Sequence, residues 1–250
     1  MAELGWLTRV LAEVPEDDRW LSEREREILS RLRAPKRRAE WRLGRWTAKQ
    51  ALAVSHGVAS ADVEVLAAAD GAPEPLTGGE PMPAALSISH RAGRALVVVA
   101  LGSTALGCDL EAVEPRSLAF VRRWLRPDER ELIAAAGADS RDLAANLLWT
   151  AKEAAAKARR EGLRLDFREA RVDAQRLGRS SGAWERLEVG WTEGSRVRGW
   201  WRSERGWVMA VVSEPAPVEP PRALSAEPTT GRGARRSDGC VEPHRGDQTG

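Results

Sequence analysis

Two stretches of this chain recur about one hundred residues later, in the same order. The first pair is separated by 104 residues and the second by 103. Because two separate matches share almost one offset, they favour an internal repeat over chance similarity in a chain rich in Arg, Ala and Glu. The sequence therefore predicts two similar, pseudosymmetric α+β lobes packed against each other, with their boundary near Ser103. The matching stretches are residues 20–29 with 124–133, and Trp46-Thr47-Ala48-Lys49 with Trp149-Thr150-Ala151-Lys152.

The end of the chain differs in composition from both halves. Residues 214–250 carry 6 of the 14 prolines and have no apolar periodicity. Such a segment cannot bury enough apolar surface to offset the entropy of ordering it. We therefore expect an N-terminal lobe over residues 1–103, a C-terminal lobe over residues 104–213 and a disordered tail over residues 214–250.

Helical and alternating patterns divide the two lobes in similar ways. A capping box at Ser22 and Glu25 opens a first helix, and Pro35 opens a longer one that runs to about residue 55. The periodicity predicts further helices at 127–136 and 142–160. Strands are expected at 62–66, 84–89, 94–101, 106–111, 184–191, 197–202 and 207–213. Four Pro and three Gly within residues 70–83 predict a loop there.

Composition excludes several classes of protein. Acids and bases nearly cancel at net +2, and Glu is interspersed with the abundant Arg, which argues against a nucleic-acid binder with a one-sided basic stripe. Two Cys and three His cannot form a disulfide framework or a typical structural zinc site, so any metal is held by oxygen. No apolar run approaches the length of a membrane span, and no signal-peptide pattern opens the sequence. We expect a soluble cytoplasmic protein that binds neither nucleic acid nor membranes.

Two carboxylates share one face of the strand expected at 106–111. Asp109 and Glu111 are two residues apart, so both point to the same side of the strand, while Leu110 points to the other. Adjacent like charges repel unless they are solvated or held by a cation. The motif therefore indicates either a cation site or a solvated strand end.

A third carboxylate lies in the helix expected at 142–160. Trp149, Glu153 and Lys157 are spaced by four residues and lie on one helix face, and the small alanines around them let long side chains reach a common point. An ordinary solubilising Glu–Lys pair is the alternative. The repeat matches Glu153 with Gln50, so one half carries the acid and the other a neutral counterpart.

Two further groups of residues suit phosphate oxygens. Ser87 and Ser89 share a strand face ahead of His90, and hydroxyl, imidazole and backbone N–H groups at a strand end can hold phosphate. A Ser–His catalytic dyad is the alternative, although no nucleophile elbow accompanies it. Basic side chains on the helix from Pro35 predict a polyphosphate-binding face, or simply a soluble surface. They are Lys36, Arg37, Arg38, Arg45 and Lys49.

Four blocks in order resemble the Sfp-type 4′-phosphopantetheinyl transferases, over about residues 20–212. The first is the Arg38, Gly44-Arg45 and Ala51-Leu52 block. The second is Ser87-Ile88-Ser89-His90, which resembles the family's S-x-S-H element. The last two are the most specific as a pair: Gly107-Cys108-Asp109-Leu110-Glu111, similar to G-x-D-x-E, and residues 149–157, similar to W-[ST]-x-K-E-[AS]-x-x-K.

The resemblance implies a two-lobed fold whose active site lies between the lobes, with coenzyme A bound there through the N-terminal lobe. It implies transfer of the phosphopantetheine arm to a serine of an acyl or peptidyl carrier protein, with release of 3′,5′-ADP. By carry-over, Asp109, Glu111 and Glu153 bind Mg²⁺, and Lys157 steadies the pyrophosphate and the departing nucleotide. Glu153, or a water on the metal, removes the serine proton. Lys36, Arg38, Arg45, Ser89 and His90 contact coenzyme A, and Lys152 takes no catalytic part.

Two positions depart from the family pattern. Ala72 stands where a basic residue is frequent, in Gly71-Ala72-Pro73, and Arg91 stands where a small residue is frequent. Both changes bear on cofactor affinity. A non-catalytic module that binds coenzyme A or a carrier protein on the same fold remains the alternative.

The sequence also bears on the partner and on assembly. We expect the carrier to meet residues 117–142, where Arg122, Arg123, Trp124 and Leu125 suit an acidic, partly apolar helix, unless Trp124 belongs to the core as its match Trp20 suggests. The internal pseudo-dimer predicts a monomer.

Overall fold

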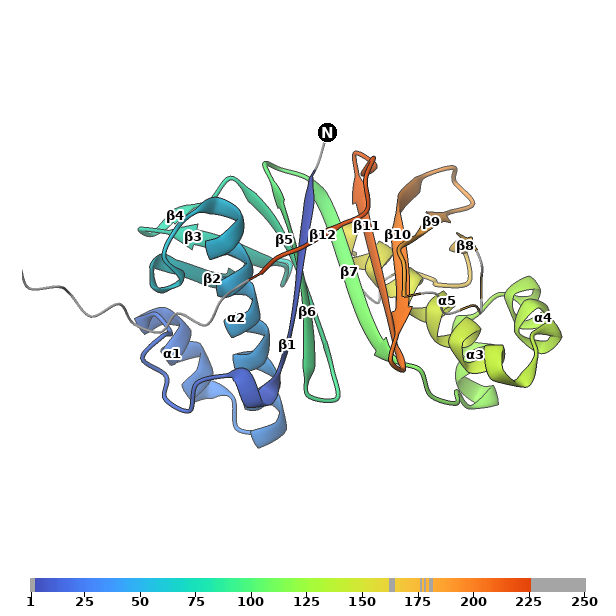
Figure 1. The fold of residues 1–250 in the computed structure, drawn as a ribbon, viewed down its shortest axis with the longest axis horizontal. Helices are drawn as coiled ribbons and strands as arrows, with labels where there is room; N and C mark the ends of the chain where they lie inside the picture. Colours follow the sequence, from blue (N-terminus) through green and yellow to red (C-terminus); the bar gives the residue numbers. More distant parts are fainter. Residues whose placement is uncertain (1–2, 162–164, 176, 178, 180–181, 226–250) are drawn as a thin grey trace, which may run out of the picture.

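Two central β-sheets divide the protein into two lobes (Figure 1). The computed structural model describes residues 3–161, 165–175, 177, 179 and 182–225. The N-terminal lobe has a sheet in the order β12-β1-β6-β5 and a small sheet β2-β3-β4, while the C-terminal lobe has the order β7-β11-β10-β9-β8. The α+β fold with two lobes that the sequence predicts is confirmed.

The N-terminal lobe contains β1 (Leu4–Val10), α1 (Glu23–Arg31), α2 (Pro35–His56), β2 (Val63–Ala67), β3 (Pro73–Thr77), β4 (Glu80–Pro81), β5 (Ala84–Arg91) and β6 (Arg94–Leu101), with short 3₁₀ turns at Leu11–Glu13 and Ser60–Asp62. The C-terminal lobe contains β7 (Ala105–Ala112), α3 (Leu118–Trp124), α4 (Pro127–Ala135), α5 (Ala138–Ala158), β8 (Arg171–Ala174), β9 (Glu185–Gly190), β10 (Arg196–Glu204) and β11 (Trp207–Glu214). The strand β12 (Arg222–Ala223) follows and rejoins the first lobe.

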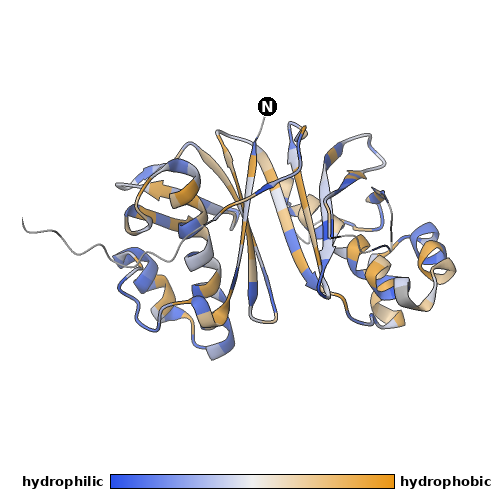
Figure 2. Cartoon of the chain, in the orientation of Figure 1, coloured by the Kyte–Doolittle hydropathy of each residue, from blue (hydrophilic) through white to orange (hydrophobic). Residues whose placement is uncertain are grey.

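An apolar layer joins the two large sheets. Leu96 and Val98 of β6 pack with Cys108 and Leu110 of β7 and with Val211 of β11, all of them buried. The outer face of each sheet packs against its long helix, α2 in one lobe and α5 in the other. Figure 2 shows the corresponding concentration of hydrophobic residues along the central strands. No helix in the part of the chain that the structure describes is long and apolar enough to cross a membrane.

The loop predicted for residues 70–83 is wrong in part, because β3 and β4 form within it. Leu76 and Met82 are buried, which gives this segment an apolar side that its Pro and Gly content obscures. Pro75 pairs with Val65 of β2, and its carbonyl accepts a hydrogen bond from Met82. The hydrogen-bonding side of Pro75 therefore points toward the short strand β4. The lack of an N–H donor is tolerated there, as it is at the edge of a sheet. The sequence patterns also did not predict β1, α3 or β8.

The chain continues as part of the fold beyond the predicted end of the C-terminal lobe. After β11, residues Arg222 and Ala223 pair in parallel with Gly5 and Trp6 of β1. Leu224 is buried against Gly5, where an added Cβ would lie 2.9 Å from its side chain. The predicted start of the tail at residue 214 is therefore too early, and residues 226–250 lie outside the described part.

A buried Lys–Glu pair occupies the same place in each lobe. Lys49 of α2 contacts the carboxylate of Glu25 at 2.7 Å, and Lys152 of α5 contacts Glu129 at 2.6 Å. Each glutamate also closes the capping box of its own short helix, α1 or α4. Both pairs are almost fully buried, and removing one partner of such a pair strands a charge at a cost of about 3–5 kcal/mol. These ion pairs are the structural basis of the repeat.

The helix α5 lies directly on β7 at a glycine. A Cβ added to Gly107 would lie 1.8 Å from the carbonyl oxygen of Ala154 and 2.6 Å from the amide of Ala158. Ala154, Ala155 and Ala156 are all fully buried, so the helix presents only methyl groups at this crossing. The first residue of the G-x-D-x-E block is therefore a packing requirement that brings α5 to β7.

Because no side chain fits at this crossing, Gly107→Ala is expected to lower the free energy of unfolding by about 3 kcal/mol. Gly190→Ala in β9 is the matched control, since its added Cβ would meet atoms no closer than 3.8 Å. Urea unfolding of both variants checks this. Equal stability of the two variants would contradict the close approach of α5 and β7.

Candidate functional site

Serine hydroxyls join the edges of the two sheets. The amide of Cys108 donates to Ser87 Oγ at 2.9 Å, and the amide of Leu110 donates to Ser89 Oγ at 3.3 Å. Side chains of β5 thus replace the backbone partners that a neighbouring strand would give to β7. We call this line of contacts between β5 and β7 the seam.

Asp109 lies at the centre of the seam and is buried. Its Oδ1 accepts hydrogen bonds from Ser89 Oγ at 2.6 Å and from Lys157 Nζ at 2.8 Å. Its Oδ2 is buried and has no hydrogen-bond partner among the residues that the structure describes. An unpaired buried carboxylate oxygen is costly, so this atom is available to a cation or a donor that enters the site.

Glu111 is surrounded by donors from both lobes. Its Oε1 accepts from the indole N–H of Trp149 at 3.3 Å, and its Oε2 lies 2.9 Å from Arg116 and 3.3 Å from Arg91. Arg91 belongs to β5, so this contact crosses the seam. Asn146 accepts from Arg116 and fixes its orientation. No sequence pattern predicts Arg116 or Asn146 here, because their contacts depend on how the strand β7 and helix α5 pack.

Glu153 and Lys157 extend from α5 toward the same carboxylates, as their spacing predicts. Burial, followed by the negative charge of Asp109, raises the pKa of Glu153 to about 7. For Lys157, burial acts to lower the pKa, but the charge and hydrogen bond of Asp109 outweigh it and the pKa is raised. Lys157 also donates to the carbonyl of Cys108 at 3.0 Å. The four charged side chains therefore form one electrostatic unit, with Glu153 titrating near neutral pH.

The thiol in the same block is not a reactive group. Cys108 points into the apolar layer between the sheets, and burial raises its pKa to about 11. It therefore stays protonated at neutral pH and acts as a small apolar side chain.

The other predicted contacts of the cofactor are dispersed. His90 is exposed at the end of β5; loss of solvent around its ring lowers its pKa, and Glu40 opposes this shift. Ser89 is buried and its hydroxyl is committed to the seam. Arg45 of α2 stacks on Trp41 at 4.9 Å, and its buried Nε has no hydrogen-bond partner. Burial lowers the pKa of this guanidinium, which leaves it a poorly solvated cation suited to an anion.

The expected basic face on α2 does not form as one surface. Lys36 is exposed and lies 3.8 Å from Glu40. Arg38 donates to the carbonyls of Leu29 and Leu32, and so closes the C-terminal end of α1. Lys49 is buried against Glu25, and the expectation that it contributes to a surface for polyphosphate is wrong.

The donor set at the seam suits a hard divalent cation. Mg²⁺ prefers carboxylate oxygens, and Asp109 Oδ2 is a buried oxygen without a partner. Asp109 and Glu111 both raise the pKa of Glu153, so the negative charge of each acts on this carboxyl. In the described part of the chain, no group of three or more His, Cys, Asp and Glu side chains is already arranged to hold a metal. Lys157, Arg91 and Arg116 neutralise the carboxylates instead.

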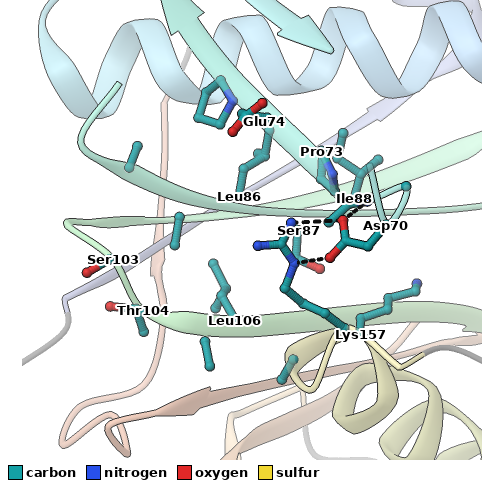
Figure 3. A pocket seen from close by; sticks show the side chains of 18 of the residues that line it. Asp70, Pro73, Glu74, Leu86, Ser87, Ile88, Ser103, Thr104, Leu106 and Lys157 are labelled. Atoms are coloured by element: carbon teal, nitrogen blue, oxygen red, sulfur yellow. Dashed lines mark hydrogen bonds and ion pairs between the residues drawn. The ribbon is translucent and has the colours of Figure 1, made fainter. Parts of the chain in front are cut away.

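A cavity of about 1080 Å³ opens between the lobes beside the seam. It is lined by residues of β3 and β5, by Ser103 and Thr104 of the connection between the lobes, and by the C-terminal end of α5. In Figure 3, Asp70 and Lys157 lie at one end of it and Ser103 and Thr104 at the other. Among the predicted site residues, Lys157 lines this cavity, while its amine contacts Asp109. Lys157 thus connects the carboxylates with a space large enough for a nucleotide-sized ligand.

The segment after β7, where the carrier is expected to bind, contains both exposed and buried side chains. Arg122 and Arg123 of α3 are exposed, and so is Leu118. Leu125 is buried, and Trp124 packs against Trp149 and Phe167 with ring centroids 5.4 and 5.7 Å away. Of the two roles weighed for Trp124, the structure therefore favours packing within the C-terminal lobe.

Residues 105–212 match the family model described as the 4′-phosphopantetheinyl transferase superfamily. The matched segment runs from β7 to β11 and contains Asp109, Glu111, Glu153 and Lys157. The resemblance seen in the sequence is confirmed at the level of this superfamily, and the Sfp-type subfamily stays a prediction. No curated protein sequence matches the chain.

Parts of the structure are similar to solved holo-[acyl-carrier-protein] synthases. The enzyme from Bacillus anthracis, solved in complex with CoA (3′,5′-ADP), is 28% identical with a TM-score of 0.35, over 40% of this chain and 96% of that one. The enzyme from Thermotoga maritima is 26% identical with a TM-score of 0.34, over 47% of this chain and 80% of that one.

The raised pKa of Glu153 predicts how a neutral replacement changes stability with pH. Its folded-state pKa of about 7 exceeds the ordinary value of 4.5, so the folded state binds the proton more tightly and stability is lost as the pH rises through this interval. Glu153→Gln removes this loss. Relative to the unmodified protein, its free energy of unfolding is expected to gain roughly 2 kcal/mol between about pH 5 and pH 8.

Denaturation curves of both proteins at several pH values measure this gain. Glu131→Gln, a change of the same charge at an exposed position of α4, is the control. A difference between Glu153→Gln and the unmodified protein that does not vary with pH would contradict the burial of an ionisable carboxylate at the seam.

Proposed function

We propose that this protein transfers the 4′-phosphopantetheine arm of coenzyme A to a serine of an acyl or peptidyl carrier protein, in a Mg²⁺-dependent reaction that releases 3′,5′-ADP. One observation carries the proposal. The amine of Lys157 on α5 contacts the buried carboxylate of Asp109 on β7, and the charges of Asp109 and Glu111 act on Glu153, inside the segment that matches the superfamily and beside the cavity between the lobes.

Asp109, Glu111 and Glu153 are the residues that would hold Mg²⁺. Bound there, the ion would neutralise charge on the pyrophosphate oxygens of coenzyme A. Asp109 Oδ2 has no partner to lose, whereas Glu111 would exchange contacts with Arg91 and Arg116.

The reaction forms a bond between the serine oxygen of the carrier and the β-phosphorus, and breaks the bond from that phosphorus to the oxygen of 3′,5′-ADP. Glu153 would take the serine proton as the general base. Lys157 provides a fixed positive charge for the departing phosphate, held in place by Asp109 and the carbonyl of Cys108.

Cations of the N-terminal lobe would hold the rest of coenzyme A. Arg45 is the strongest candidate, because burial lowers the pKa of its guanidinium and its buried Nε meets no hydrogen-bond partner among the described residues. His90 lies on the same lobe at the end of the seam, and Lys36 and Arg38 complete the proposed set. The carrier would approach the exposed residues Leu118, Arg122 and Arg123 of α3, which suit an acidic helix with an apolar face.

Incubation with coenzyme A, Mg²⁺ and a panel of apo-carrier proteins tests the proposal directly. We expect intact-mass spectra of at least one carrier to gain the mass of one phosphopantetheine arm. No gain with any carrier, under conditions in which a known transferase modifies them, would refute transfer. Binding of coenzyme A without any gain would support the non-catalytic module instead.

Asp109→Asn is expected to lower the rate of this transfer by at least about 100-fold, because it removes a charge that orients Lys157 and would ligate the cation. Asp173→Asn on β8 is the matched control, an exposed carboxylate on the far edge of the same sheet. Single-turnover rates by mass spectrometry compare the two. Equal rates in Asp109→Asn and the control would remove Asp109 from the site.

A further inference from the structure

Arg160 reaches across the cavity between the lobes. It follows α5, and its guanidinium contacts Asp70 of the other lobe at 2.6 and 2.9 Å. Both residues line the cavity, and the dashed lines at Asp70 in Figure 3 mark its contacts there. Of the residues that line this cavity, all in the described part of the chain, Lys157 and Arg160 carry positive charge. Since Lys157 is held by Asp109, Arg160 is the cation that faces the space itself.

The backbone at Arg160 is of a kind that normally selects glycine. Its φ is +57°, and its amide bonds to the carbonyl of Lys157 while the next amide bonds to that of Ala156. These two bonds define the Schellman motif that ends many helices, in which the left-handed position is usually Gly. A long side chain there is strained, and residues strained in this way cluster at active sites and ligand-binding sites.

The partner of Arg160 is easily exchanged. The side chains of Arg160 and Asp70 are 55% and 31% exposed, and ion pairs at such exposure contribute little to stability. Asp70 also accepts a hydrogen bond from the amide of Ala72, so it keeps a partner when the guanidinium leaves. A phosphate carries more charge than a carboxylate and matches the planar fork of arginine.

We propose that Arg160 binds a phosphate group of coenzyme A in this cavity. In the absence of the ligand, its guanidinium pairs with the carboxylate of Asp70. This assignment rests on the proposed function. It gives the cavity a phosphate-binding cation next to Gly71-Ala72-Pro73, a stretch that contains none. Arg160 is thereby a residue that determines affinity for the cofactor, contributed by the lobe opposite to that stretch.

Replacing Arg160 with glycine separates binding from folding. Glycine relieves the strain at the helix end, so Arg160→Gly is expected to raise Tm by about 2–4 °C. It is also expected to weaken the binding of coenzyme A about tenfold by isothermal titration calorimetry. Asp70→Asn removes the competing charge and is expected to tighten binding. Arg159→Ala is the matched control, because Arg159 contacts Glu161, Glu193 and Trp191 and does not line the cavity.

Titrations with dephospho-coenzyme A identify the phosphate. A loss of affinity for coenzyme A alone assigns Arg160 to the 3′-phosphate, and an equal loss for both ligands assigns it to the pyrophosphate. Unchanged affinity in Arg160→Gly, while the unmodified protein binds coenzyme A and modifies a carrier, would overturn this inference and leave the proposed function standing. Failure of the unmodified protein to bind coenzyme A would overturn both.

Discussion

The hydroxyls of Ser87 and Ser89 accept hydrogen bonds from two backbone amides of β7. In a continuous sheet, a neighbouring strand would accept these bonds. This interaction sets how the edge strands of two separate sheets lie against each other. The apolar layer behind these strands stabilises the contact. Asp109 stands between the two bonded amides of β7, so its position is set by the same register. The site is therefore a consequence of how the lobes are joined. Neither lobe contains the whole of it, since Ser89 and Arg91 come from one lobe and Glu111 from the other.

The long helices bring the remaining charges to this line. Gly107 admits the backbone of α5 onto β7, and the buried pair of Lys152 with Glu129 anchors the other side of that helix to α4. The N-terminal lobe uses the same anchor, Lys49 with Glu25, but has Gln50 where α5 has Glu153. One framework is thus present twice, and the acidic side chain is present in one copy. This asymmetry agrees with the proposal of one cation site rather than two.

Contacts within one element were predictable from the sequence, and contacts between elements were not. Helical spacing is enough to predict that Trp149, Glu153 and Lys157 share a face, and strand spacing is enough for Asp109 and Glu111. Which hydroxyl meets which amide across the seam depends on packing, and so do the pairs of Arg91 with Glu111 and of Arg160 with Asp70. Lys49 was misassigned to a surface, although the repeat held the signal: each capping-box glutamate precedes its lysine by nearly the same distance, 24 and 23 residues.

In the proposed function, carboxylates from β7 and α5 form one divalent cation site at the junction of the lobes. Electron paramagnetic resonance of added Mn²⁺, a spectroscopic substitute for Mg²⁺, measures this without any substrate. We expect one bound Mn²⁺ per chain, with affinity weakened at least about tenfold both in Asp109→Asn and in Glu153→Gln, and unchanged in Asp173→Asn. Unaltered Mn²⁺ affinity in the first two variants would contradict it.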